Sequence, residues 1–149
     1  MEVIDMRTLL LLCFVLLTGF AQAEQKQVFG DYEVHYMGLT SSELDAKVAR
    51  LYDIPRSRNV GFLNIAVLKK GVSDMPVAWD AKIEGEMSNL IGQKSELEFK
   101  RIQETSALYF ISTFDFYDQN MYRFHIKVTP EGSKRTFDVK FNQKFYRGE

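Results

Sequence analysis

Three side chains that can bind metals alternate along one predicted strand near the start of the mature chain: Asp31, Glu33 and His35. Alternate residues of a strand face the same side, with Cα atoms about 6.6 Å apart. Carboxylates and imidazole could therefore hold a divalent ion if a second strand added ligands. No recognised ligand spacing accompanies them, and solvated polar residues give the same pattern. We predict no metal site and no cofactor.

Two arginines form the most suggestive loop, because Arg56 and Arg58 flank Ser57 directly after the rigid Pro55. A pair of guanidinium groups could grip a carboxylate or a phosphate. Alternatively, one or both could tie the loop to nearby groups of the same chain. Asn89 begins a second candidate segment, Asn-Leu-Ile-Gly-Gln, in which the amides could bind a ligand or fix a turn. The resulting candidate binding surface is Arg56, Arg58, His35 and Asn89.

The residues for nucleophilic catalysis are largely missing. The only cysteine is Cys13, no Gly-x-Ser-x-Gly motif occurs, and the two histidines are His35 and His125. Both histidines fall on the charged faces of predicted strands. We therefore predict no catalytic residues and expect that the chain is not an enzyme.

The first 23 residues have the pattern of a secretory signal peptide. Arg7 precedes the apolar run Leu9–Leu17, and the small residues Ala21 and Ala23 follow, which predicts cleavage after Ala23. The apolar run is too short to span a bilayer, and Cys13 lacks the small preceding residues of a lipoprotein signal, so we expect no stable membrane anchor. Cleavage would remove Cys13 and leave no disulfide. The expected location is the periplasm.

Charge argues against nucleic acid as a partner. The whole chain has 19 basic and 20 acidic residues, and the predicted signal peptide contains one basic and two acidic ones. The mature chain is therefore neutral overall, and its basic pairs are scattered beside acidic residues.

The elements that must position these residues are mostly strands. Alternating apolar and polar residues recur from Val28 to Phe145, whereas 44–51 has helical spacing after a capping-box pattern at Thr40–Glu43. We predict one mostly-β domain over 24–149, with one short helix and about eight strands, among them a weaker one at 86–91. An antiparallel, immunoglobulin-like β-sandwich is favoured over a small β-barrel. The last three strands are expected to form a meander.

Several separated segments resemble a known family. They are Gly30–Tyr36, Arg56-Ser57, Asn64-Ile65, Asn89–Gln93, Ala107–Phe110 and Phe141-x-Gln143-x-Phe145-Tyr146. In this order they are similar to the DUF4426 family of uncharacterised, exported proteins of Gram-negative bacteria. The resemblance implies a periplasmic location and a bacterial source, and it supplies no activity, cofactor or catalytic residue.

Two functions remain open from the sequence. The leading hypothesis is a non-enzymatic binding or envelope-assembly module that presents loops or a strand edge to another envelope protein. The alternative is a carrier for a small apolar or lipid-like ligand, because the interior is rich in aromatic residues. A filled core would favour surface recognition, and a hollow core would favour cargo.

Overall fold

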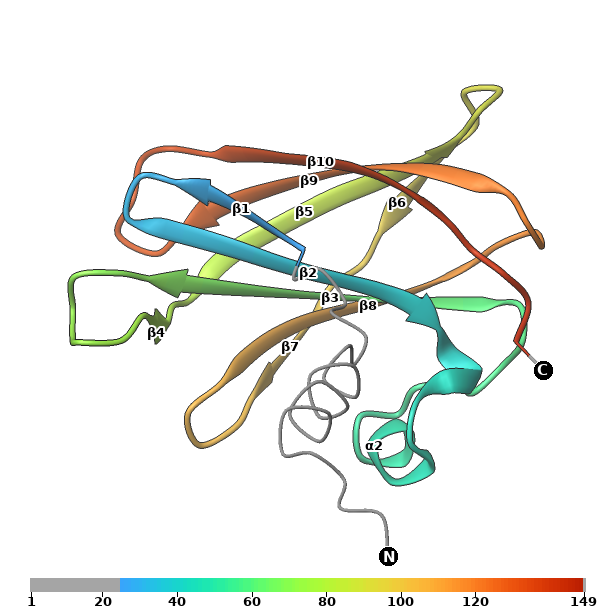
Figure 1. Ribbon diagram of the computed structural model, residues 1–149, viewed down its shortest axis with the longest axis horizontal. Helices are drawn as coiled ribbons and strands as arrows, with labels where there is room; N and C mark the ends of the chain where they lie inside the picture. The colour runs from blue at the N-terminus through green and yellow to red at the C-terminus, as the bar shows by residue number, and fades with distance from the viewer. Residues whose placement is uncertain (1–24, 149) are drawn as a thin grey trace, which may run out of the picture.

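The computed structural model describes residues 25–148, which form two antiparallel sheets packed face to face (Figure 1). The predicted signal peptide, its cleavage site and Cys13 lie outside the described residues. In the described part of the chain, no helix has the length and hydrophobicity needed to cross a membrane. The prediction of an antiparallel β-sandwich is confirmed, and no closed barrel forms.

The first sheet has six strands and is called sheet A. Its order is β1 (Lys26–Phe29), β2 (Tyr32–Thr40), β3 (Val60–Lys69), β8 (Leu108–Asp115) and β7 (Lys100–Gln103), and the short β4 (Val77–Ala78) also pairs with β3. The second, sheet B, has four strands. Its order is β10 (Phe137–Lys144), β9 (Met121–Pro130), β5 (Ala81–Asn89) and β6 (Lys94–Leu97).

The main core lies between the two sheets and is filled with apolar side chains. Leu63, Ile65 and Val67 of β3 are fully buried. They share this core with aromatic rings in direct contact, such as Phe124 and Phe141, whose centroids are 4.8 Å apart. Such packing is the main source of stability in a chain without a disulfide.

Two glycines show how completely this core is filled. A Cβ atom at Gly61 would lie 2.2 Å from a ring carbon of Phe114, and one at Gly85 would lie 2.6 Å from Cδ1 of Ile126. Both distances are far below van der Waals contact. The core has no room for an added methyl group at these points.

A smaller core covers part of the outer face of sheet A. The 3₁₀ turn η1 (Ser41–Glu43) and the helix α2 (Ala46–Leu51) bring Ala49 and the following Ile54 against Phe62 of β3. The helix begins later than the capping-box pattern predicted. Asp45 caps it by accepting hydrogen bonds from the N–H groups of Lys47 and Val48, at 2.8 and 3.3 Å.

Three details of the strand prediction were wrong. The last three strands do not form a meander, because β8 belongs to sheet A and β9 and β10 belong to sheet B. The alternating segment 96–100 is not one strand, since the chain changes sheets between β6 and β7. The weak strand predicted at 86–91 is largely the end of β5, which is continuous over Ala81–Asn89.

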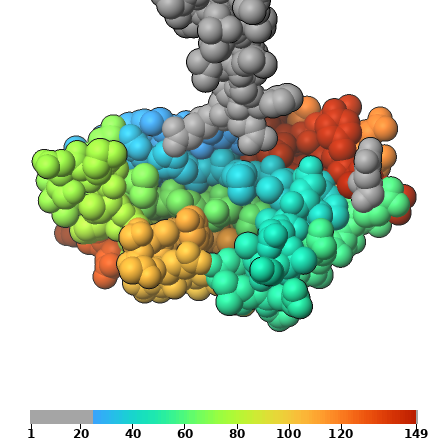
Figure 2. Space-filling view, turned by 60° about the horizontal axis from the view of Figure 1, so that its bottom comes forward, coloured from blue at the N-terminus to red at the C-terminus, as the bar shows by residue number. Residues whose placement is uncertain are grey.

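The loops of the sandwich fall at two ends. The β3–β4 loop (residues 70–76) lies at one end, and the β5–β6 turn, α2 and the C-terminus lie toward the other (Figure 1). The space-filling view also places the region around residues 70–80 and the region of α2 at opposite ends of one face (Figure 2). At about 3.3 Å per residue, the nine residues of β5 separate the β4–β5 connection from the β5–β6 turn by roughly 27 Å.

Candidate functional site

The two arginines of the predicted binding loop contact the backbone of their own chain. Arg56 Nη2 donates to the carbonyl of Ser42 at 2.9 Å. Arg58 Nε donates to the carbonyl of Gly148, near the C-terminus. Each guanidinium therefore joins the loop between α2 and β3 to a segment distant in sequence.

The buried Ser41 holds the same loop through hydrogen bonds to its backbone. Its side chain is fully buried, and its Oγ donates to the carbonyls of Pro55 and Ser57, at 2.7 and 3.1 Å. The same Oγ accepts the N–H of Ser57 at 2.9 Å. One hydroxyl thus satisfies several backbone groups that burial would otherwise leave without partners. The polar groups of this loop are used to hold it against the sandwich.

Glu33 is the centre of a charged cluster on sheet A. It is 7% exposed, and its carboxylate lies 3.1 Å from His35 Nε2, 3.1 Å from Lys70 Nζ and 3.9 Å from Lys26 Nζ. The hydrogen bond from His35, followed by that from Lys70, lowers the pKa of Glu33 below its ordinary value, although partial burial opposes the shift. The cluster links β1, β2 and the loop after β3.

This arrangement does not fit a metal site. The carboxylate of Glu33 already accepts from Lys70 and His35, and Lys26 lies 3.9 Å away. Within residues 25–148, no group of three His, Cys, Asp or Glu side chains could hold a metal ion.

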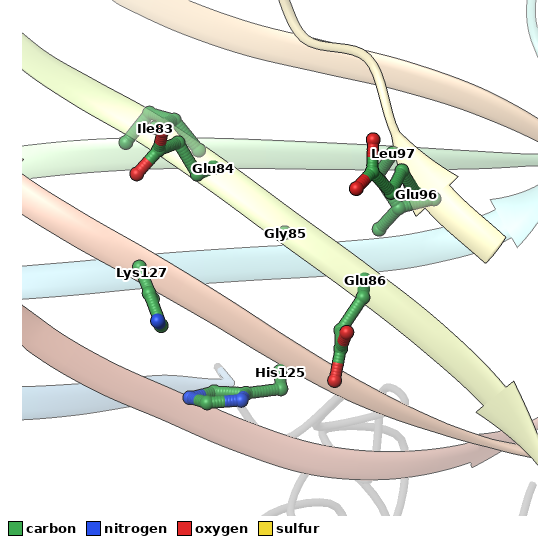
Figure 3. Close-up of a pocket in the computed structure, with 8 residues that line it drawn as sticks. All are labelled: Ile83, Glu84, Gly85, Glu86, Glu96, Leu97, His125 and Lys127. Carbon is green, nitrogen blue, oxygen red and sulfur yellow. The ribbon is translucent and has the colours of Figure 1, made fainter. Parts of the chain in front are cut away.

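A broad groove of about 560 Å³ lies along sheet B (Figure 3). Glu86 of β5 is opposite His125 of β9 in the strand register, and the close-up shows their side chains near one another. His125 Nε2 lies 2.6 Å from Asp138 Oδ1, and Lys94 Nζ lies 2.9 Å from Glu86 Oε1. These hydrogen bonds lower the pKa of Asp138 and of Glu86. Glu86 and His125 of the groove are therefore each paired with a charged side chain beside it.

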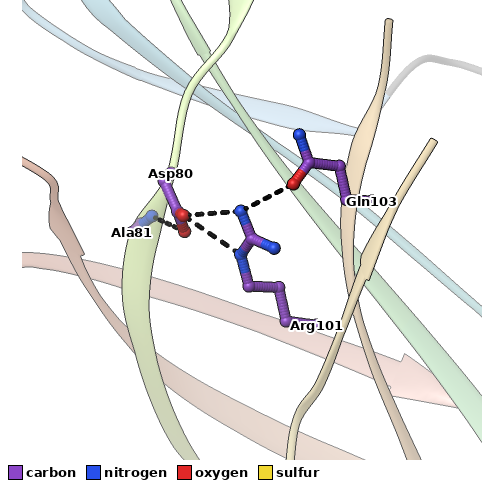
Figure 4. A network of polar contacts seen from close by, with 4 residues as sticks. All are labelled: Asp80, Ala81, Arg101 and Gln103. Carbon is purple, nitrogen blue, oxygen red and sulfur yellow. Dashed lines mark hydrogen bonds and ion pairs between the residues drawn. The ribbon is translucent and has the colours of Figure 1, made fainter. Parts of the chain in front are cut away.

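The corner where the chain enters sheet B is tied to the edge of sheet A by an arginine (Figure 4). Arg101 of β7 donates through Nε and Nη2 to Asp80 Oδ2, at 3.0 and 2.7 Å, and its Nη2 also reaches Gln103. The bonds to Arg101 lower the pKa of Asp80 and raise that of Arg101. Asp80 also accepts the N–H of Ala81 at 2.8 Å. This network joins the two sheets.

The turn between β5 and β6 is rigid because Asn89 and Gln93 bond to each other through side chains and backbone. Asn89 Nδ2 donates to Gln93 Oε1 at 2.7 Å, and the Gln93 N–H donates to Asn89 Oδ1 at 2.9 Å. The Asn89 N–H also donates to the Gln93 carbonyl at 3.1 Å. Gly92 has a φ of +84°, which favours glycine. Asn89 therefore fixes the turn, as one sequence interpretation expected.

The two residues between these anchors point apolar side chains into solvent. Leu90 is 59% exposed and Ile91 is 81% exposed. They line a pocket of about 360 Å³ together with Met121 and Lys144 and with the loop residues Gln119 and Asn120. Two tyrosines of adjoining segments are exposed as well, Tyr117 by 79% and Tyr146 by 58%. We name this region the tip surface: Leu90, Ile91, Tyr117, Met121, Lys144 and Tyr146.

The four residues of the predicted binding surface come from different places in the fold. His35 is in β2, Arg56 and Arg58 precede β3, and Asn89 ends β5. The structure places Arg56 and Arg58 on one loop and His35 and Asn89 on two separate strands. Their use in binding stays a prediction.

The sequence indicated the segment of the tip surface but not the side chains that it exposes. The candidates in the sequence were the amides of Asn89 and Gln93, whereas the exposed side chains are Leu90 and Ile91. The available signal was an apolar pair between residues typical of a turn, where neither a strand nor a helix could bury it.

Comparison with known proteins identifies relatives over nearly the whole domain. The model of the domain of unknown function DUF4426 matches residues 26–148. A crystal structure of a DUF4426 family protein from Pseudomonas aeruginosa shares 33% sequence identity, with 87% of this chain and 100% of that chain covered and a TM-score of 0.73. A search of curated proteins found no match.

More distant structures share the fold. A copper-bound variant of FetP from uropathogenic Escherichia coli is 11% identical, with a TM-score of 0.59 over 84% of this chain and 96% of that chain. FetP as isolated after recombinant expression in the periplasm of E. coli is similar to the same degree, with 85% and 96% covered. The family match spans the described domain, so the chain belongs to the DUF4426 family.

Proposed function

We propose that this chain is a periplasmic, non-enzymatic binding or assembly domain that contacts another component of the cell envelope through the tip surface. The observation that carries the proposal is the exposure of Leu90 and Ile91 on a turn that holds its shape without them. Apolar side chains gathered at one exposed place are typical of interaction sites. The other candidate loop, in contrast, directs its polar groups to its own backbone.

The periplasmic location is supported by the predicted signal peptide and by the fold shared with FetP, which was recombinantly expressed in the periplasm of E. coli. Fractionation of a Gram-negative host should recover the protein in the periplasmic fraction, and N-terminal sequencing should begin at Glu24. A chain that retains residues 1–23 would contradict this part of the proposal.

The carrier alternative is less well supported, because apolar side chains of both sheets pack together in the main core and are tightly packed at Gly61 and Gly85. The residues of this chain do not favour the copper binding of the FetP variant. Glu33 is bonded to Lys70 and His35, and no group of three His, Cys, Asp or Glu side chains among the described residues could hold a metal ion.

The proposal can be tested by chemical crosslinking of the exported protein in cells. We expect wild type to crosslink to envelope components and the Leu90→Ser/Ile91→Ser variant to lose these products. Val72→Ser/Met75→Ser is the matched control, since these residues are 55% and 72% exposed at the opposite end. Products that persist in the tip variant and disappear in the control would overturn the proposal.

A further inference from the structure

We propose that the tip surface binds an anionic phospholipid bilayer, with Leu90 and Ile91 inserted among the headgroups and acyl chains. The inference rests on the proposed function and specifies the envelope component that is contacted. It depends on three features of this end of the sandwich: an exposed apolar turn, two exposed tyrosines, and basic side chains on the strands next to the turn.

The apolar turn is the connection between β5 and β6, which protrudes from the sandwich (Figure 1). Leu90 and Ile91 are held by the Asn89–Gln93 bonds and have large exposed fractions of 59% and 81%. A rigid turn loses little conformational freedom when it enters another medium. Two such side chains give weak, reversible insertion and not a permanent anchor.

The flanking tyrosines are Tyr117 and Tyr146. Both are more than half exposed, and both belong to segments that meet beside the pocket of the tip surface, since the Gln119 N–H donates to the Phe145 carbonyl at 2.9 Å. Tyrosine concentrates at membrane interfaces because its ring is apolar and its hydroxyl is polar. These two exposed tyrosines, on segments that adjoin the pocket residues Gln119 and Lys144, have that chemistry.

The cations lie on the strands just behind the turn. Arg123 faces Ser88 and Lys144 faces Met121 in the register of sheet B, whereas Lys94, which also faces Ser88, is paired with Glu86 at 2.9 Å. Within the tip segments 88–93, 117–122 and 142–146, the one acidic residue is Asp118, whose carboxylate accepts the Arg147 N–H at 2.7 Å. Acidic residues such as Glu86 and Glu96 begin farther from the turn. This charge order complements an anionic surface.

The opposite end of the sandwich lacks this combination. Its loop exposes Val72 and Met75, but Asp74 lies between them, and the segment 70–76 contains no aromatic residue. Exposed apolar side chains alone are common on protein surfaces. The association of all three features at one end favours a lipid surface as the occupant of the tip.

Flotation with lipid vesicles tests the inference on the processed protein purified from the periplasm. We expect equal fractions of wild type and of Val72→Ser/Met75→Ser to float with vesicles of phosphatidylethanolamine and phosphatidylglycerol. This floating fraction is called retention below. Retention of Leu90→Ser/Ile91→Ser should fall roughly tenfold, because the inserted apolar area is lost. Lys144→Gln should weaken retention less, and added salt should weaken it further. All variants share one N-terminus, and their matching thermal melts would show intact folds.

Each outcome decides the inference. Failure of wild type to float with these vesicles, equal retention of the tip variant, or equal binding to uncharged phosphatidylcholine vesicles would overturn it. Loss of crosslinks to an envelope protein in the tip variant, without vesicle binding by wild type, would leave the proposed function standing and reject the lipid surface.

Discussion

Two loops of this sandwich contain residue types that could bind a partner. One uses these side chains for bonds within the chain, and the other leaves two apolar side chains exposed. The arginine loop between α2 and β3 contains Arg56 and Arg58, which bond backbone carbonyls of the same chain. The β5–β6 turn contains Asn89 and Gln93, which satisfy each other and leave Leu90 and Ile91 exposed. A loop's capacity to bind therefore depends on which side chains remain after the fold has used the others.

The largest effect on stability should come from the arginine loop. Ser41→Ala removes a fully buried hydroxyl that bonds three backbone groups, so we expect a loss of about 2 kcal/mol in the free energy of unfolding. Urea denaturation measures this change. A loss below roughly 0.5 kcal/mol, the range of ordinary surface substitutions, would show that the loop does not depend on Ser41.

An intermediate effect on stability is expected at Asn89, which holds the turn that exposes Leu90 and Ile91. Asn89→Ala removes both side-chain bonds of the turn and should cost about 1 kcal/mol. Because Leu90 and Ile91 remain present, vesicle retention should fall less than in the Leu90→Ser/Ile91→Ser variant. If retention instead falls to the same level, the shape of the turn matters as much as its apolar side chains.

A smaller effect should follow from Arg56→Gln. Its guanidinium bonds one exposed carbonyl, so the free energy of unfolding should fall by roughly 0.5 kcal/mol, with vesicle retention unchanged. Thermal melting and flotation measure the two quantities. Loss of retention at unchanged stability would make the arginine loop part of the binding surface and break the contrast between the loops.

The Glu33 cluster supplies a third region, and its effect depends on pH. The pKa of Glu33 is lowered from 4.5 in the folded protein, so its charge stabilises the fold above 4.5, and this contribution disappears as the pH falls through the folded pKa. Glu33→Gln should therefore be less stable than wild type at neutral pH and approach it at acid pH. The difference should be small, because Lys26 and Lys70 are exposed enough for solvent to screen them. Melting temperatures measured across acid and neutral pH would test this, and a constant difference would contradict it.

The period-two pattern predicted most of the strands because one face of each strand is buried. Val34, Ile126 and Val139 are buried as their alternation indicated. Pairing partners were harder to predict, because alternation marks a face but not a sheet. The segment around Phe99 alternates as one strand would, although the chain there passes from sheet B to sheet A.

The candidate site could be predicted only in part for a related reason. The residue types at Arg56 and Arg58 indicate possible binding, but the sequence does not show that the carbonyls of Ser42 and Gly148 are within reach. Conversely, the predicted weak strand at 86–91 included Leu90 and Ile91, which the turn exposes to solvent. Contacts between distant segments decide which polar groups are used and which apolar groups are left exposed.

Hydrogen exchange of the processed protein, measured by mass spectrometry with and without envelope membranes, tests most directly whether the tip end is the binding end. The account predicts slower exchange in residues 89–93 and 117–121 when membranes are added, and unchanged exchange in 55–59 and 70–76. Protection of the arginine loop or of the β3–β4 loop, with the tip unaffected, would contradict it.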